Sequence, residues 1–370
     1  MFDLANQVDH PIRLELGEPD FATPAHIVEA AVEALHRGAT HYTPTAGIMP
    51  LRQAIADKLL RENGIPVDPA TQVIATVGAV SALALSVQVL VQEGGEVLVP
   101  DPGWPNYVSH VVWAGGTPVH VPLPAENGFH LHRDILRRYV TPRTRAIIIN
   151  SPSNPTGAVF TREEIEGIAA FAVEHDLVLI SDEVYEKILF DGHTHYSPAS
   201  NSDFRDHVIT INSFSKTYAM TGWRLGYAAG PASLISAMTL LQEISVSCPN
   251  AATQEAGRVA LSGPQDAVDD MVRHYTARRR LLVDGLNQIP GFSCRAPEGS
   301  FYVFANVSKF GKAGDVAERL IREARVVTVP GTGFGPSGEG HVRLSFATSE
   351  ENLREALRRL EAWAKAQKVG

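Results

Sequence analysis

Hydrophobic periodicity divides this chain into two parts. Between residues 73 and 211, apolar runs of strand length alternate with longer segments whose apolar residues recur at helical spacing. Alternation of this kind predicts βαβ units, and therefore a largely parallel sheet with helices on both faces. The expected strands are 73–77, 96–99, 145–149, 177–180 and 208–211, and the expected helices between them are 79–92 and 163–175.

The pattern outside this part is mostly helical. Thr23 and Pro24 are predicted to be the N-cap and the first residue of a helix that runs to about residue 35. A second helix is expected over 49–62. After residue 230 we expect helices over 232–286, short strands at 302–304, 326–329 and 342–346, and a last helix over 350–366.

These elements predict an α/β fold with a mainly parallel sheet, together with a smaller α+β unit. A chain of 370 residues also exceeds the roughly 250–300 residues at which a single core stops growing, which favours two domains. We expect a large domain over 38–255 and a small domain formed by 1–37 and 256–370.

Composition narrows the possible partners. Hydrophobic residues make up 44% of the chain and charged residues 20%, as in ordinary globular proteins. The formal net charge of -9 disfavours nucleic acid and anionic membranes, because both require a clustered positive surface. The partner is therefore expected to be a small molecule.

Cysteine usage and hydropathy suggest the compartment. Cys248 and Cys294 form no metal-binding spacing, and both are interpreted as buried or incidental thiols. The longest apolar stretch, 79–91, is too short and too polar to span a bilayer, and the amino terminus shows no secretory signal. We expect a cytoplasmic protein.

Polar residues follow four of the predicted strands. Ligands of open α/β sheets bind beyond the carboxyl ends of the strands, so these residues are expected to converge. They comprise a helix start that can bind an anion at Gly78, Ala79 and Val80, an amide at Asn154, a carboxylate and a phenol at Asp182 and Tyr185, and an amine at Lys216 with Ser213 and Ser215.

Each of these signals is weak by itself. A lysine after a strand is usually solvated, and an aspartate there often caps a helix. Trp104 and Tyr107 are equally consistent with core aromatics. His193 and His195 have a spacing seen in metal sites, but the sequence offers no evident third ligand, so no metal is expected.

One segment is far more specific. The run SFSKTYAMTGWRLGY at 213–227 has a serine three residues before Lys216 and an arginine, Arg224, eight residues after it. It resembles the cofactor-lysine signature of the fold-type I pyridoxal-phosphate aminotransferases of class I and II, the aspartate aminotransferase family. The motifs LELGEPDF, DPGWPNY, NSPSNPTG, SDEVY and VRLSFA follow the order of that family and extend the resemblance over nearly the whole chain.

The resemblance implies an enzyme that moves an amino group between an amino acid and a 2-oxo acid by a ping-pong mechanism. It also implies a role for each matching residue. Lys216 would form the Schiff base with pyridoxal phosphate and shuttle a proton, Asp182 would face the pyridine nitrogen, and Tyr185 and Asn154 would face the 3-hydroxyl. Trp104 would cover the ring, while Ser213, Ser215, Arg224 and the amides after Gly78 would hold the phosphate. Arg343, Gly17 and Asn154 would bind the substrate carboxylate, and Tyr42 would reach the phosphate of the neighbouring subunit in a homodimer.

Two departures bear on the substrate. Many relatives in the subgroup that this chain most resembles carry a lysine where Val80 stands, and that lysine assists with acidic side chains. The segment 245–254 also lacks an arginine that would clamp a distal carboxylate. We therefore expect an apolar, aromatic or less common amino donor in preference to aspartate or glutamate.

Other reactions remain open at this point. A β-lyase or a decarboxylase on the same fold is the first alternative, because the bond that breaks is the one held perpendicular to the cofactor ring. A distant alternative is a regulator that uses this domain to sense the cofactor. The acidic charge and the thirteen residues before the first motif leave little room for a DNA-binding region.

Overall fold

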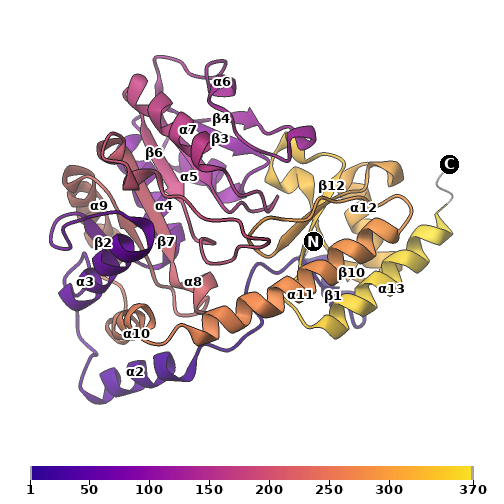
Figure 1. Cartoon of the computed structure of the whole chain (residues 1–370), viewed down its shortest axis with the longest axis horizontal. Helices are drawn as coiled ribbons and strands as arrows, with labels where there is room; N and C mark the ends of the chain where they lie inside the picture. Colours follow the sequence, from indigo (N-terminus) through magenta and orange to yellow (C-terminus); the bar gives the residue numbers. More distant parts are fainter. Residues whose placement is uncertain (1, 368–370) are drawn as a thin grey trace.

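The computed structural model describes residues 2–367 and is built around a seven-stranded sheet flanked by helices (Figure 1). This confirms the predicted α/β class. In spatial order the strands are β2 (Val73–Thr76), β8 (Gly226–Ala229), β7 (Val208–Ser213), β6 (Val178–Asp182), β5 (Thr144–Asn150), β3 (Glu96–Asp101) and β4 (Thr117–Pro122).

Five neighbouring strands, from β7 to β4, are parallel, while β8 runs antiparallel to both of its neighbours. In the parallel part Asp182 lies opposite Asn150 on one side and Ile211 on the other. The carboxyl ends of β5, β6 and β7 therefore meet at one edge. Polar residues that follow these three strands are brought together by this register.

Both faces of the sheet are buried. Along β5, Ala146 and Ile148 pack into one hydrophobic cluster, while Ile147 and Ile149 pack into the other. Alternate residues of a strand point to opposite faces, which explains why this strand is a continuous apolar run in the sequence. The helices that cover the sheet include α4 (Gly78–Leu90), α5 (Pro105–Trp113), α7 (Arg162–Glu174) and α9 (Ala232–Val246).

A second, smaller part contains an antiparallel sheet of three strands and a parallel pair. The long helices α11 (Asp266–Gln288) and α13 (Glu350–Ala366) run side by side along it (Figure 1). The three-stranded sheet consists of β11 (Val329–Pro330), β12 (His341–Ser345) and β9 (Tyr302–Asn306), and the pair consists of β1 (Ile12–Arg13) and β10 (Val326–Val327).

Shorter helices complete the structure. They are α1 (Phe2–Ala5), α2 (Ala25–His36), α3 (Met49–Lys58), α6 (Arg133–Leu136), α8 (Phe214–Thr217), α10 (Ala251–Ser262) and α12 (Ala313–Arg319). Two π-helical turns, η1 (Leu59–Asn63) and η6 (Leu320–Ala324), extend α3 and α12. The 3-10 turns are η2 (Ala125–Asn127), η3 (Pro198–Ser200), η4 (Arg205–His207), η5 (Ser308–Phe310), η7 (Gly331–Phe334) and η8 (Pro336–Gly338).

The prediction of Thr23 as a helix N-cap is wrong. Helix α2 begins at Ala25, Pro24 precedes it, and its N-cap position makes no side-chain hydrogen bond. The Thr23 hydroxyl instead donates to the carbonyl of Ala219 at 2.7 Å and accepts from Nε1 of Trp223 at 3.0 Å. Thr23 therefore ties the start of the chain to the segment after Lys216, a long-range contact that outweighs local capping.

Within residues 2–367, no helix is both long and apolar enough to cross a membrane.

Candidate active site

A cavity of about 410 Å³ opens at the edge where the carboxyl ends of β5, β6 and β7 meet. Most of the residues selected from the sequence line it, so the structure does bring them together. Its lining includes Gly17, Ala79, Val80, Trp104, Asn154, Asp182, Tyr185, Ser213, Ser215, Lys216, Arg224 and Arg343.

Asp182 is the last residue of β6 and is buried at the base of this cavity. Its Oδ2 accepts a hydrogen bond of 2.7 Å from the hydroxyl of Tyr107, and its Oδ1 accepts one from the backbone N–H of Val184. Burial raises the pKa of Asp182 to about 6, although both hydrogen bonds act to lower it. No basic side chain within residues 2–367 forms an ion pair with it, so a cationic group in the cavity would stabilise its charge.

Lys216 projects into the cavity from α8, directly after β7. Its Nζ donates to the carbonyl oxygen of Gly17 at 2.5 Å. Burial, assisted by the nearby charge of Arg343, lowers the pKa of Lys216 to about 8. A lowered pKa makes the neutral, nucleophilic amine accessible near physiological pH.

One end of the cavity is suited to an anion. Gly78 has φ +77 and opens the thirteen-residue helix α4, with the backbone of Ala79 at the cavity wall. The positive φ favours glycine at this position, and a Cβ added there would also lie 2.5 Å from Nη2 of Arg224, so the guanidinium would have to move. The helix start and the guanidinium, with Ser213 and Ser215 nearby, supply positive potential and donors.

The opposite end contains Arg343, on the central strand β12 of the three-stranded sheet. Its Nη1 donates to Oδ1 of Asn154 at 3.0 Å and its Nη2 to the carbonyl of Glu15 at 2.6 Å, while the buried Nε has no partner within residues 2–367. The guanidinium lies over the ring of Tyr302, 4.3 Å from its centroid. This arrangement holds the guanidinium rigidly at the cavity wall.

Tyr185 and Tyr302 face each other with their hydroxyl oxygens 3.0 Å apart. Burial raises the pKa of both phenols, so both keep their protons. One hydroxyl donates to the other, and the proton of the accepting hydroxyl is free to point into the cavity. Gly17 lies against the same group, because a Cβ at this position would come within 2.7 Å of the Tyr302 hydroxyl. A side chain at Gly17 would therefore narrow the cavity.

Two predicted residues lie outside the lining. Gly78 is buried behind Ala79, and Tyr42 has 89% of its surface exposed and does not contact the cavity of its own chain. Sequence reasoning missed Tyr302 and Asn150, and it did not distinguish Tyr107 from a core aromatic. Tyr107 could have been selected from the sequence, because its motif DPGWPNY follows the end of a predicted strand, as the other motifs do.

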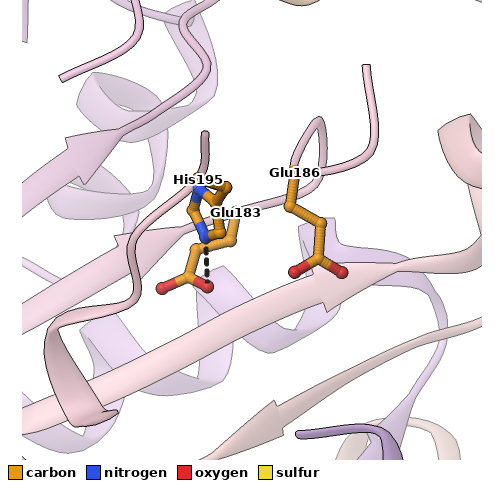
Figure 2. A group of neighbouring side chains, drawn as sticks. All are labelled: Glu183, Glu186 and His195. Atoms are coloured by element: carbon orange, nitrogen blue, oxygen red, sulfur yellow. Dashed lines mark hydrogen bonds and ion pairs between the residues drawn. The ribbon is translucent and has the colours of Figure 1, made fainter. Parts of the chain in front are cut away.

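His195 also proves to have acidic neighbours. Glu183, Glu186 and His195 place potential metal-ligand atoms within 4.8 Å of one another, as Figure 2 shows. The sequence had suggested no third ligand, because the carboxylates come from a different segment. Glu186 is already paired with the ammonium of Lys58, and Glu183 accepts a 2.8 Å hydrogen bond from His195.

Comparison with known proteins gives one consistent result. Residues 9–360 match the family model described as aminotransferase class I and II. The chain is 46% identical to aromatic-amino-acid aminotransferase 2 of Thermococcus litoralis and 44% identical to aspartate aminotransferase of Pyrococcus abyssi, covering all of this chain and 95% of each relative. It resembles the crystal structure of an aromatic aminotransferase from Pyrococcus horikoshii with a TM-score of 0.96 and 45% identity, covering both chains fully.

Proposed function

Because this chain belongs to the class I and II aminotransferase family and is a pyridoxal-phosphate-dependent enzyme that moves an amino group from an amino acid to a 2-oxo acid, we propose that it reacts in the cavity around Lys216. One observation carries this proposal. The amine of Lys216, the carboxylate of Asp182 and the guanidinium of Arg343 line the same cavity although they are far apart in the sequence.

The cavity fits the cofactor. Pyridoxal phosphate supplies an aldehyde for amines and a ring that withdraws the electrons left when a Cα–H bond breaks. Asp182 offers the buried carboxylate that a protonated pyridine nitrogen needs, and Tyr185 with Asn154 offers donors for a phenolate oxygen. The start of α4 and Arg224 offer donors for a phosphate, with Ser213 and Ser215 beside them, and Trp104, which also lines the cavity, would cover the ring.

The protein contributes binding and proton transfer. Lys216, whose pKa is lowered to about 8, would hold the cofactor through its amine and, once released, would take up the proton of the substrate Cα. Each Nη of Arg343 makes one hydrogen bond within the protein and carries a second N–H, which could donate to a carboxylate in the cavity. We assign the substrate carboxylate to Arg343, with Asn154 and Gly17 beside it.

The substrate side chain is proposed to be apolar or aromatic. Among the residues that line the cavity, only Lys216, Arg224 and Arg343 are strongly basic, and each already has a role in the proposal. Val80 and Leu16 line the cavity with apolar side chains. A second carboxylate on the substrate would therefore find no further cationic partner among the residues that line the cavity.

A half-reaction tests both parts of the proposal. The purified holoenzyme is mixed with one amino acid at a time and no 2-oxo acid, and the visible absorbance of the cofactor and the product are followed. We expect about one 2-oxo acid per site and no free ammonia, with faster reactions for phenylalanine, methionine and alanine than for aspartate. Repeated release of pyruvate and ammonia would identify a β-lyase, and an equal or faster reaction with aspartate would contradict the proposed donor class.

The assembly is proposed to be a homodimer in which Tyr42 reaches the cavity of the neighbouring subunit. Tyr42 is 89% exposed, and α9 carries the exposed apolar residues Leu240 and Ile244.

We further propose a cytoplasmic location, supported by the free thiols of Cys248 and Cys294. The division into a large domain over 38–255 and a small domain over 1–37 and 256–370 is supported by the position of the two main sheets, within 73–229 and 302–345.

A further inference from the structure

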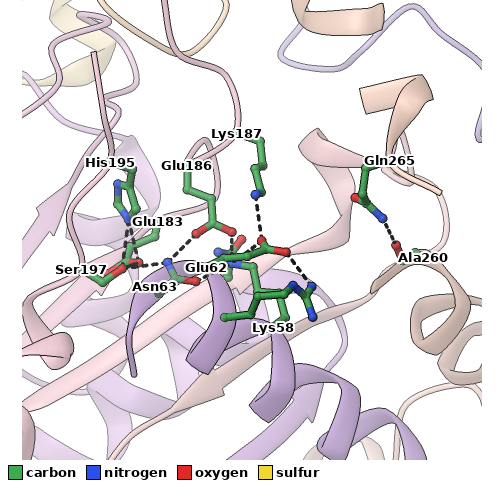
Figure 3. A network of polar contacts seen from close by, with 12 residues as sticks. Lys58, Glu62, Asn63, Glu183, Glu186, Lys187, His195, Ser197, Ala260 and Gln265 are labelled. Atoms are coloured by element: carbon green, nitrogen blue, oxygen red, sulfur yellow. Dashed lines mark hydrogen bonds and ion pairs between the residues drawn. The ribbon is translucent and has the colours of Figure 1, made fainter. Parts of the chain in front are cut away.

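The short segment 182–186 carries side chains of two kinds on two sides. Asp182 and Tyr185 line the active-site cavity. Glu183 follows Asp182 in the sequence, and Glu186 follows Tyr185. Both glutamates extend into a buried polar cluster and not into the cavity, as Figure 3 shows. The position of each cavity residue is therefore coupled through the backbone to an acidic neighbour.

Both glutamates are held by several donors. Oε1 of Glu183 accepts from Ser181 at 2.8 Å, and Oε2 accepts from His195 at 2.8 Å and from Ser197 at 2.5 Å. Oε1 of Glu186 accepts from the ammonium of Lys58, and Oε2 accepts from the amide of Asn63 at 2.7 Å.

The two halves are joined into one network. The amide of Asn63 also donates to the Ser197 hydroxyl at 2.8 Å, and its Oδ1 accepts from Lys58 at 2.8 Å. We call Lys58, Asn63, Glu183, Glu186, His195 and Ser197 the Lys58–Glu186 network. Because both oxygens of each glutamate are bonded, neither carboxylate has freedom to rotate within it.

A local irregularity of the helix makes this network possible. Lys58 and Asn63 are five residues apart, and in a regular α-helix their side chains would be separated by about 140° around the axis. The π-helical turn Leu59–Asn63 widens the helix and places both side chains on the face that meets Glu186. Such turns are frequent at functional sites.

The charges of the network are matched. Burial acts to raise the pKa of Glu186, but the charge of Lys58, helped by His195 and by the amide of Asn63, lowers it to about 2. Burial acts to lower the pKa of His195, but Glu183 outweighs it and raises that pKa. With His195 protonated, Lys58 and His195 face Glu183 and Glu186 in a buried volume, while Glu62, 4.0 Å from Lys58, is paired with Lys187.

Stability alone does not account for this arrangement. A buried ion pair recovers little more than its desolvation cost, and apolar residues of similar volume often stabilise a protein as well or better. Its advantage is defined geometry, since each bond fixes a direction as well as a distance. The structure thus places a directional network directly behind two residues whose orientation matters for the proposed chemistry.

We propose that the Lys58–Glu186 network is a positioning device, which holds the 182–186 segment so that the carboxylate of Asp182 and the phenol of Tyr185 meet the cofactor in the correct orientation. This inference rests on the proposed roles of Asp182 and Tyr185. The network also reaches the other side of the site. A small cavity of about 10 Å³ is lined by Lys58 and Glu186 on one wall and by Asn212 and Ser213, at the end of β7, on another.

An electrostatic link supports the same inference. The negative charge of Glu183 acts to raise the pKa of Asp182, in addition to the larger effect of burial. A displaced Glu183 would therefore change the protonation of Asp182 as well as its position. The bound cofactor reports this change, because its visible absorbance depends on the groups around its ring.

The test replaces the ion pair without leaving an unpaired charge. The double variant Lys58→Met with Glu186→Met removes both charges at similar volume. We expect a midpoint of urea unfolding close to that of the wild type, together with a weaker dissociation constant for pyridoxal phosphate and a shifted pH midpoint of the visible band. We also expect kcat to fall on the order of ten- to a hundred-fold, because small misplacements of catalytic groups have effects of this size. Ser197→Ala, which removes one bond to Glu183, should shift the same quantities less.

Glu164→Gln is the matched control. It breaks a second partly buried charge cluster, with His130, that does not include residues 182–186. It should lower the unfolding midpoint and leave the pH midpoint of the visible band unchanged. If the double variant and Ser197→Ala both keep the wild-type band and cofactor affinity, the positioning role is overturned. If the wild type itself binds no pyridoxal phosphate, the proposed function fails instead.

Discussion

The hydroxyl of Tyr107 donates a 2.7 Å hydrogen bond to Oδ2 of Asp182, and both side chains are buried. Burial raises the pKa of Asp182 to about 6, and the bond from Tyr107 is the largest effect in the opposite direction. The charge of a carboxylate that we propose to face the pyridine nitrogen thus depends on a phenol from α5. The two residues are 75 positions apart in the sequence.

Tyr107→Phe is expected to move the acidic limb of the kcat profile to higher pH. Loss of the hydrogen bond would raise the pKa of Asp182 above 6, so the carboxylate would be neutral over more of the working range. A hydrogen bond to a charged group contributes about 1.5–3 kcal/mol, which corresponds to a shift of about one to two pH units. Steady-state rates between about pH 5 and 9, a range that brackets the acidic limb before and after this shift, measure it.

Tyr275→Phe provides the control for this measurement. Tyr275 is also buried, but its hydroxyl lies outside the cavity and has no hydrogen-bond partner within residues 2–367. Its replacement should leave the acidic limb in place. An acidic limb that does not move in Tyr107→Phe would show that the pKa of Asp182 does not depend on this phenol.

Lys216→Met is expected to stabilise the apoenzyme near neutral pH while abolishing transamination. Burial, with the charge of Arg343, lowers the folded-state pKa of Lys216 from 10.5 to about 8. Below pH 8 the amine is charged in both states, so the cost of burying its charge is fully present. Between pH 8 and 10.5 the folded state releases its proton first, so this cost fades as the pH rises.

The gain in the free energy of unfolding at pH 7 should be on the order of 2 kcal/mol, and it should narrow as the pH approaches 10.5. Urea unfolding of the two apoenzymes at pH 7 and pH 10 measures it. Lys309→Met, at an exposed position, should show no such gain. If transamination persists in Lys216→Met, the proposed reaction centre is wrong.

Some of the site was predictable because strong local patterns surround it. The strands β5, β6 and β7 are buried on both faces, so they appear as continuous apolar runs, and the polar residues at their ends stand out. Strand β8 was missed because its residues, Gly226–Ala229, are mostly small and carry little pattern. Its Gly226 is needed for close packing, since a Cβ there would lie 2.5 Å from the backbone nitrogen of Ala79.

The missed site residues depend on long-range contacts. Tyr302 lies on a strand with apolar neighbours and resembles a core residue until its hydroxyl is seen 3.0 Å from that of Tyr185. Lys58 meets Glu186 across 128 positions, and Asn63 joins them because a π-helical turn follows α3. Neither hydrophobic periodicity nor motif spacing contains this information.

Mixed dimers test the proposed role of Tyr42. A chain with Lys216→Ala lacks its own amine but still offers Tyr42, whereas a chain with Tyr42→Ala keeps its amine. If Tyr42 serves the neighbouring subunit, each mixed dimer regains one complete site, and random mixing should restore about a quarter of the wild-type sites. Both parent variants are expected to have little activity when pure.

The two variants are co-refolded, and their activity is compared with that of each variant alone. A gain in activity indicates that Tyr42 serves the neighbouring subunit. A version in which both changes are in the same chain is the control, because mixing it with the wild type creates no new complete site. Activity that only averages the two parents would contradict a Tyr42 shared between subunits.

His130 links three separate segments of the chain. Its Nδ1 lies 2.9 Å from Glu164 on α7, and its Nε2 lies 3.6 Å from Glu298, in the loop before β9. The hydrogen bond from His130 to Glu164, with the nearby carboxylate of Glu298, raises the pKa of His130 to about 9 although burial opposes both. The histidine is therefore a cation at neutral pH and bridges two carboxylates.

His130→Ala should consequently destabilise the protein in a pH-dependent way. A histidine whose folded-state pKa is raised contributes stability that is fully present below pH 6.5 and is lost as the pH rises through 9. We expect a loss on the order of 2 kcal/mol in the free energy of unfolding at pH 6, shrinking towards pH 10, measured by urea unfolding of the holoenzyme. His132→Ala is a suitable control, since His132 is 53% exposed and lies 3.7 Å from Glu164. An equal loss at both pH values would indicate that His130 acts by packing against Phe160 and not by its charge, because packing does not depend on the protonation of the ring.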